Sequence, residues 1–320
     1  MNKLLATAVL AAAAALAAVP AQAQFPSKPI RIVVPFPGGS ATDAITRILG
    51  NSVSAAVGQP IVVDNKAGAD GAIAASEVAK APPDGYTLLM ATNSPMSVVP
   101  AMKKSPPYDP VADFTPITDV GRYTFFLYAN ASTPIKSFQE LIAYAKANPG
   151  KLNYATGNTT GIVSFIQMNS LAGIEMTHVP YRGEPQGIAD LVAGRVQLMW
   201  ATPTTGLSHV KDGKLRAIVT SLKSRSELLP EVPTIYESGM PQFTIVSWAG
   251  LYGPARLPQE IVQRLNKEFT DAMKRPDVQA QMHKQAFAMN PSTPEQLATH
   301  TREQLESYRR ILRAAGVQPE

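Results

Sequence analysis

The sequence predicts an α/β protein of two lobes, each built on a sheet that helices cover on both faces. Three observations predict this. Short apolar runs of strand length are continuous rather than alternating, as in parallel strands buried on both faces. Each run is followed by a stretch with apolar residues at helical spacing. Two such series occur, one beginning near Ile30 and the other near Phe125.

The first series opens with the apolar run Ile30 to Val34, which ends at Pro35 and a Gly-Gly pair. Apolar residues then recur at helical spacing from Ala44 to Val57, and Gly58-Gln59-Pro60 ends that helix. In this series we predict strands at 30–34, 61–63 and 86–91 and helices at 44–57 and 72–80.

In the second series, Ser137 with Glu140 three residues later predicts a capping box that opens a helix. We predict strands at 125–128, 152–155, 176–180, 196–200 and 215–220, a helix at 137–147 and further helices between the later strands. Two C-terminal helices, at 259–275 and 294–315, need a partner sheet. If they pack on the first lobe, the chain crosses between the lobes twice.

The first 23 residues predict a cleaved export leader. Lys3 supplies a positive end, Leu4 to Val19 is an unbroken apolar run, and Ala21-Gln22-Ala23 has the small residues that a signal peptidase reads. A membrane anchor needs roughly 20 apolar residues, more than this run contains. We therefore expect cleavage near Ala23/Gln24 and a periplasmic protein.

Composition excludes several classes of protein. With no cysteine there is no disulfide framework, thiolate metal site or cysteine nucleophile. The formal net charge of +5 falls to +4 without Lys3 and includes no Lys/Arg run, so no nucleic-acid partner is expected. The 297 residues after Ala23 suffice for two domains that fold without disulfides.

Catalytic motifs are also missing from the sequence. It contains no G-x-x-x-x-G-K-[ST], no G-x-G-x-x-G after a strand, no G-x-S-x-G and no H-E-x-x-H. His178 reads as a packed strand residue, and Asp43 as an N-terminal helix cap or a partner of the helix dipole rather than a catalytic acid. Trp200, Trp248 and Phe36 could line a cleft or belong to the core. We expect no enzyme activity, no cofactor and no metal.

One local arrangement occurs four times: an apolar strand, a short loop of Gly and hydroxyl residues, and then a helix. The loops are 37–43, 156–161, 181–185 and 201–206. In open parallel sheets such loops gather at the carboxyl ends of the strands, where ligands bind. The N–H groups of a first helical turn, with hydroxyls and close backbone approach at glycine, suit an anion without any Arg or Lys. Any one of these loops could equally serve only to turn the chain.

The residues also resemble a known family. The stretch FPSKPIRIVVPFP at 25–37, followed by GGSATD, resembles the opening of the Bug family, the substrate-binding proteins of tripartite tricarboxylate transporters. The likeness continues in order through DNKAG at 64–68, APPDGY at 81–86, YDP at 108–110, HVPYRG at 178–183, GKLRA at 213–217 and LPEVPT at 229–234.

This resemblance implies a two-lobed type II periplasmic-binding-protein fold, in which each lobe is a sheet flanked by helices and two crossover strands join the lobes. Lobe 1 is then 24–125 with 247–320, lobe 2 is 126–246, and the hinge lies near 121–126 and 246–250. By position, the loops 36–43 and 157–161 hold a ligand carboxylate. The candidate ligand-binding residues are Phe36, Gly38, Gly39, Ser40, Ala41, Thr42, Asp43, Asn93, Gly157, Asn158, Thr159, Thr160, Gly161, Tyr181, Arg182 and Thr202.

The loops depart from the family pattern at several positions. Ala41 intervenes before Thr42, Ile162-Val163 replace a usual His-Leu pair, and Arg182 stands where Lys is usual, with Glu184 beside it. Arg182 meets a distal polar group of the ligand in one hypothesis and forms a solvated pair with Glu184 in the other.

The expected function is capture of a small organic acid in the periplasm, with hinge closure and delivery by a monomer to membrane transporter subunits. A sensory module for a membrane kinase, or a secreted enzyme on the same scaffold, stays open as an alternative. The identity of the acid is also open.

Overall fold

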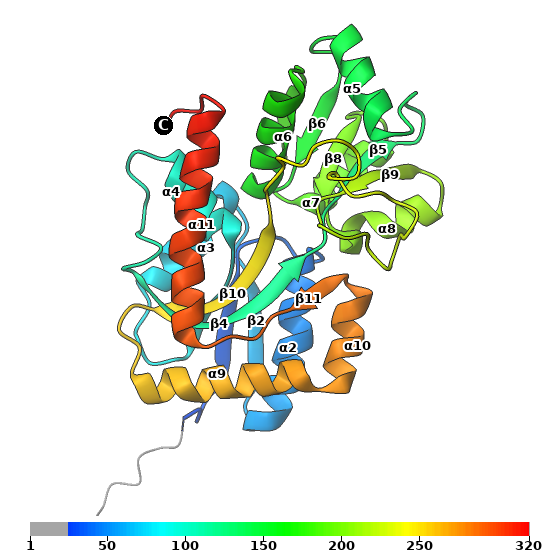
Figure 1. The fold of residues 1–320 in the computed structure, drawn as a ribbon. Coiled ribbons are helices and arrows are strands. Elements are labelled where there is room, and N and C mark those ends of the chain that lie inside the picture. The colour runs from blue at the N-terminus through cyan, green and yellow to red at the C-terminus, as the bar shows by residue number, and fades with distance from the viewer. Residues whose placement is uncertain (1–24, 320) are drawn as a thin grey trace, which may run out of the picture.

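The computed structural model describes residues 25–319 and divides them between two sheets, each with helices on both sides (Figure 1). We call the part around the six-stranded sheet lobe 1 and the part around the five-stranded sheet lobe 2. The predicted leader, 1–23, and its cleavage site lie outside the described residues. The α/β, two-lobed architecture predicted from the sequence is confirmed.

Lobe 1 combines the N-terminal elements with the C-terminal ones. Its strands are β1 (Ile30–Val34), β2 (Ile61–Asn65), β3 (Thr87–Thr92), β4 (Phe114–Tyr123), β10 (Ser247–Pro254) and β11 (Phe287–Met289). Its helices are α2 (Ala41–Val57), α3 (Ala72–Ala79), α4 (Val99–Met102), α9 (Gln259–Lys274), α10 (Pro276–Lys284) and α11 (Pro294–Ala314), with two short turns, η1 (Ala69–Gly71) and the π-helical η2 (Ser94–Val98). The sheet order is β11-β4-β10-β3-β1-β2, with β1 parallel to β2 and β3, and β10 antiparallel to β3 and β4.

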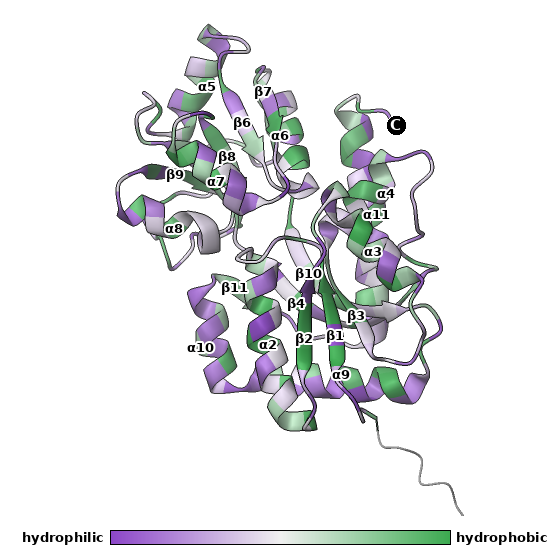
Figure 2. Ribbon diagram, turned by 180° about the vertical axis from the view of Figure 1, so that it is seen from behind, coloured by the Kyte–Doolittle hydropathy of each residue, from purple (hydrophilic) through white to green (hydrophobic). Residues whose placement is uncertain are grey.

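Both faces of this sheet are buried, which explains the continuous apolar runs. Ile32 and Val34 of β1 pack toward α2, where they meet Ile45 and other core residues, whereas Val33 points to the opposite face and packs with α3. Strands β1 and β2 are among the most hydrophobic ribbons in Figure 2, although β2, at the edge of the sheet, is only partly buried. Helices α2, α9 and α10 cover one face, and α3, α4 and α11 cover the other (Figure 1).

Lobe 2 repeats the arrangement with fewer strands. Its strands are β5 (Phe126–Asn130), β6 (Asn153–Thr156), β7 (Thr177–Pro180), β8 (Leu198–Ala201) and β9 (Leu215–Thr220), and its helices are α5 (Phe138–Ala147), α6 (Thr159–Ala172), α7 (Glu184–Val192) and α8 (Pro203–Lys211). The order is β7-β6-β8-β5-β9. The capping box predicted for α5 is half wrong: Ser137 Oγ accepts from Glu140 N as expected, but Glu140 Oε2 accepts from the N–H of Lys136 rather than of Ser137.

The chain passes between the lobes twice. It leaves lobe 1 through Thr124 and Phe125, which join β4 to β5, and returns through residues 221–246 to β10. Because β4 and β10 are antiparallel neighbours that pair Tyr123 with Ser247, the two passages lie side by side (Figure 1). The C-terminal helices α9 and α11 pack on lobe 1, against β4, as the predicted double crossing requires.

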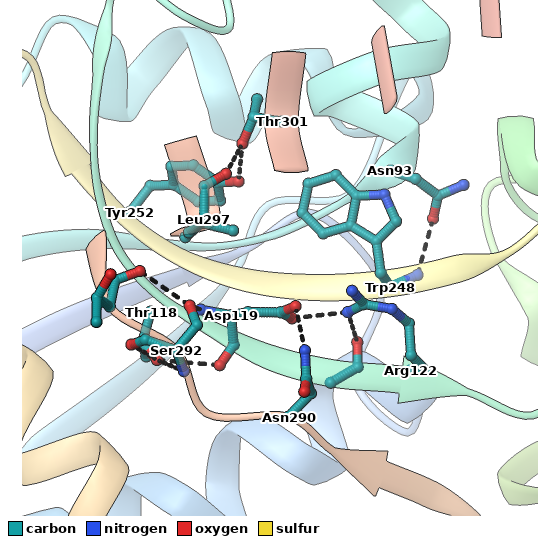
Figure 3. Close-up of polar contacts among 12 residues, drawn as sticks. Asn93, Thr118, Asp119, Arg122, Trp248, Tyr252, Asn290, Ser292, Leu297 and Thr301 are labelled. Carbon is teal, nitrogen blue, oxygen red and sulfur yellow. Dashed lines mark hydrogen bonds and ion pairs between the residues drawn. The ribbon is translucent and has the colours of Figure 1, made fainter. Parts of the chain in front are cut away.

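A polar network around the buried Asp119 ties β4 to the segment that follows β11 (Figure 3). Asp119 is 3% exposed and accepts hydrogen bonds from Arg122 Nη1 at 2.8 Å and from Asn290 Nδ2 at 2.9 Å. Tyr252 of β10 and Thr301 of α11 are joined through their hydroxyls at 2.7 Å.

Between residues 25 and 319 no helix is both long and apolar enough to cross a bilayer. Over the same residues, no group of three or more His, Cys, Asp or Glu side chains is arranged to hold a metal ion.

Candidate functional site

The four strand–loop–helix segments meet at one cavity between the lobes. Helix α2 of lobe 1 and helices α6, α7 and α8 of lobe 2 each place residues of their first turn or cap on its wall. The space measures about 350 Å³ including its mouth. Its lining residues are Phe36, Ser40, Ala41, Thr42, Thr92, Ser94, Tyr123, Phe125, Gly157, Asn158, Thr160, Glu184, Thr202 and Ser247.

The residues that begin these helices explain the polarity of the wall. Ser40 caps α2 with its Oγ accepting from Asp43 N, and Asn158 caps α6 with its Oδ1 accepting from Gly161 N at 2.9 Å. Gly183 and Thr202 stand at the caps of α7 and α8. The remaining first-turn N–H groups of a helix have no partner within it, and its N-terminus carries partial positive charge. The cavity is therefore surrounded by dipoles that favour an anion.

Three lobe 1 hydroxyls on the wall keep a hydrogen to donate. Ser40 Oγ accepts from Asp43 N, Thr92 Oγ1 accepts from Ser94 N, and Thr42 Oγ1 accepts from the Tyr123 hydroxyl at 2.9 Å. None of these three hydroxyls donates to an acceptor between residues 25 and 319. Each can therefore turn its O–H toward a bound oxygen.

The aromatic residues of the wall are buried. Burial raises the pKa of Tyr123 far above its ordinary value, so Tyr123 stays a neutral phenol that donates to Thr42. Phe36 and Phe125 add apolar surface beside the polar groups. Apolar walls with a few placed polar groups are typical of small-molecule sites.

Glu184, the first residue of α7, lies inside the site. It is 6% exposed and accepts from Thr202 N at 3.0 Å, Thr202 Oγ1 at 2.7 Å, Thr205 Oγ1 at 3.1 Å and Asn158 Nδ2 at 3.3 Å. Burial raises its pKa, and these hydrogen bonds oppose the rise. The solvated Arg182–Glu184 pair considered from the sequence is wrong, because Arg182 is exposed while Glu184 is buried and bonded elsewhere.

The cavity brings together half of the sixteen candidate residues. Phe36, Ser40, Ala41, Thr42, Gly157, Asn158, Thr160 and Thr202 line it, whereas Gly38, Gly39, Asp43, Asn93, Thr159, Gly161, Tyr181 and Arg182 do not.

The candidates away from the wall have identifiable roles. Asp43 accepts from Gly39 N and Arg47 at the start of α2. Burial opposes its ionisation, but these hydrogen bonds outweigh burial and its pKa lies below the ordinary value. Of the two roles expected from the sequence, the helix cap is wrong, because Ser40 is the cap, and the place of Asp43 in the first turn matches the dipole partner. Tyr181 donates to Asp190 at 2.7 Å, a contact outside the cavity lining.

Asn93 lies behind the cavity and joins the two lobes. Fully buried, it donates from Nδ2 to Thr160 Oγ1 of lobe 2 at 2.6 Å and to the Tyr308 hydroxyl of α11 at 2.8 Å. Its Oδ1 accepts longer bonds from Ser247 Oγ and from Trp248 N, the latter drawn in Figure 3. One amide thus connects α6, α11 and β10 at the point where the chain crosses between lobes.

Asn93→Ala is expected to lower the free energy of unfolding by about 2–3 kcal/mol, because it leaves several buried polar groups without their partner. Ser97→Ala is a matched control on the same segment, since Ser97 is fully buried and its Oγ has no hydrogen-bond partner between residues 25 and 319. Urea unfolding of both variants measures the difference. Equal, small losses would contradict the bridging role of Asn93.

Six lining residues were not among the candidates. Thr92 and Ser94 flank Asn93 directly after a predicted strand, so the polar run at 92–94 could have identified them. For Glu184, the sequence left open whether its side chain touches the ligand. Tyr123 and Ser247 lie on the crossing strands and carry no periodic signal, and Phe125 was predicted only as the first residue of a strand. Trp200 and Trp248 belong to the buried core, not to the cavity wall.

Residues 45–317 match the family described as the tripartite tricarboxylate transporter family receptor. Protein BugT of Bordetella pertussis is 32% identical to the chain over 323 residues, which cover 99% of this chain and 98% of BugT.

Two solved structures with bound acids share the fold. A protein of R. palustris with adipate is 30% identical, with a TM-score of 0.89 and coverage of 92% of this chain and 100% of that one. MatC from Rhodopseudomonas palustris with bound malate is 29% identical, with a TM-score of 0.85 and coverage of 90% and 100%.

Proposed function

Since the chain belongs to the tripartite tricarboxylate transporter receptor family, we propose that it captures a small carboxylate in the interlobe cavity and delivers it to a membrane transporter. Family members are periplasmic binding proteins. Export of this chain, with cleavage near Ala23/Gln24, and its action as a monomeric receptor without catalysis are parts of the same proposal.

The observation that carries the proposal is the composition of the cavity wall. Four helix N-termini and three hydroxyls with free hydrogens surround it, and its lining contains no Lys, Arg or His. Hydrogen bonds to a charged group contribute roughly 1.5–3 kcal/mol each. Three or four of them, less the cost of immobilising the ligand, reach the about 8 kcal/mol of a micromolar site.

The contacts between the lobes support a closed, ligand-holding arrangement. Besides Asn93 and Thr160, Thr204 Oγ1 donates to Gln285 Oε1 at 2.9 Å across the lobes. In addition, Gly183 of lobe 2 packs against the ring of Pro37 in lobe 1. We propose that the lobes open at the two adjacent crossings, 121–126 and 246–250, to admit the ligand.

Thermal-shift screening against a library of organic acids tests the proposal. An acid at about 100 times its dissociation constant stabilises the protein by about 2.7 kcal/mol, which corresponds to a rise in Tm of roughly 5 °C. Mass spectrometry of the incubated acid should recover it unmodified. Shifts produced only by compounds without a carboxylate would contradict the assigned ligand class, and turnover of the acid would favour the enzyme alternative.

A further inference from the structure

We propose that Glu184 makes the cavity selective for a ligand that carries an amine or ammonium group in addition to its carboxylate, and that it disfavours a dicarboxylate. The inference rests on the proposed function, because it assumes that the same cavity holds the carboxylate. It narrows the ligand class from small acids in general to amino-substituted acids.

The hydrogen bonds of Glu184 are distributed unevenly over its two oxygens. Oε2 accepts three, from Thr202 N, Thr202 Oγ1 and Thr205 Oγ1, at distances from 2.7 to 3.1 Å. Oε1 accepts one, from Asn158 Nδ2 at 3.3 Å, near the limit of a hydrogen bond. Since each carboxylate oxygen has two lone pairs, Oε1 retains the capacity to accept from a ligand, and Glu184 is part of the cavity wall.

The charge of Glu184 has no cationic partner among the residues of the wall. The groups that donate to it are a backbone N–H, two hydroxyls and an amide. A buried carboxylate is costly unless it is paired, and burial accordingly raises the pKa of Glu184. A ligand ammonium bound in the closed cavity would supply both the missing charge and a donor for Oε1.

The other groups of the cavity wall indicate how such a ligand would be oriented. Three hydroxyls with free hydrogens, Ser40, Thr42 and Thr92, belong to lobe 1, whereas Glu184 belongs to lobe 2. A carboxylate that binds the lobe 1 hydroxyls leaves the other end of the molecule to face Glu184. At that end a second carboxylate would meet a like charge, which disfavours ionisation of one of the two.

Isothermal titration calorimetry with matched pairs of probes tests the selectivity. Each pair has one carboxylate in common and differs at the other end: 4-aminobutanoate against succinate, and 5-aminopentanoate against glutarate. We expect the wild type to bind the amino acid of each pair roughly tenfold or more tightly than the dicarboxylate, as one charge-assisted hydrogen bond implies.

Glu184→Gln removes the charge but keeps an oxygen for the three donors at Oε2. We expect it to lose the preference, with tighter binding of the dicarboxylate and weaker binding of the amino acid. Glu175→Gln is the matched control, because Glu175 is an exposed carboxylate of the same lobe outside the cavity lining, and it should keep the wild-type ratio.

The outcomes separate this inference from the proposed function. A wild type that prefers the dicarboxylates, or a folded Glu184→Gln variant with an unchanged ratio, overturns the role of Glu184 and leaves the carboxylate receptor standing. If butylamine binds the wild type as tightly as 4-aminobutanoate and loses affinity in Glu184→Gln, the role of Glu184 stands and the carboxylate function fails. If Glu184→Gln does not fold, the wild-type ratio decides alone.

Discussion

Gly157→Ala is expected to weaken ligand binding by roughly 100-fold or more while the chain stays folded. An added Cβ at this position would overlap Glu184 N and Gly183 C and lie 2.8 Å from Glu184 Cα. These are backbone atoms, which cannot swing aside as a flexible side chain can. The loops that follow β6 and β7 must therefore separate, and this displaces Asn158, Thr160 and Glu184 on the cavity wall.

The size of the effect follows from the number of contacts that move. A separation of the two loops misplaces several ligand hydrogen bonds of about 1 kcal/mol or more each, which together give roughly the stated loss. Overpacking at such a site costs about 1–3 kcal/mol of folding free energy. Calorimetry with the acid that gives the largest thermal shift measures the affinity, and urea unfolding measures the stability.

Gly161→Ala is the control for this variant. Gly161 is in the same loop and helix start, but its added Cβ would meet Thr156 only at 3.6 Å, an ordinary contact, and the N–H that bonds Asn158 is retained. We expect near wild-type affinity. Similar losses in the two variants would mean that the close approach at Gly157 does not shape the site.

Gly183→Ala is expected to weaken binding by roughly 10- to 100-fold through a different cause, which is obstruction of closure. Its added Cβ would lie 2.7 Å from Cδ and 2.8 Å from Cγ of Pro37, on the opposite lobe. The proline ring cannot rotate away, so the lobes can relieve the contact only by moving apart. The backbone at Gly183 is extended, with φ −176°, so an alanine there is not otherwise strained.

Small-angle scattering with and without the ligand measures this effect directly. The Gly183→Ala variant should stay more extended than the wild type when ligand is present, with little change in unfolding free energy. Gly38→Ala is the matched control, since its Cβ would meet nothing within 4 Å and Gly38 lies next to Pro37. A Gly183→Ala variant that binds and contracts like the wild type would contradict the proposed closure.

The sequence predicted strand β1, whose apolar residues are buried, and missed β4, whose polar groups find distant partners. Strand β1 reads as a run of strand length that is apolar except for Arg31, and its position was correct to the residue. Strand β4 contains Thr118, Asp119 and Arg122 and shows no strand pattern, although most of it is buried. Its polar groups are satisfied by Asn290 and Ser292, about 170 residues later in the chain.

The residues of the candidate site likewise fall into those that the sequence identified and those that it missed. The Gly and hydroxyl loops before α2, α6 and α8 were recognisable, because a strand, a loop of small polar residues and a helix start are local patterns. The contribution of Tyr123 and Ser247 could not be recognised in the sequence, because these residues reach the cavity only through the pairing of β4 with β10.

By itself, the sequence determined the α/β class, the two series of strands and helices, and the loops that suit an anion, since each depends on hydrophobic periodicity and local backbone chemistry. The tertiary structure alone decided that all four helix starts face one cavity, that Asn93 bridges the lobes behind it, and that Glu184 is a buried wall residue rather than half of a surface ion pair. The physical reason is that burial and hydrogen-bond partners are properties of residues brought together by folding, and a carboxylate beside an arginine reads the same in sequence whether water or a closed cavity surrounds it.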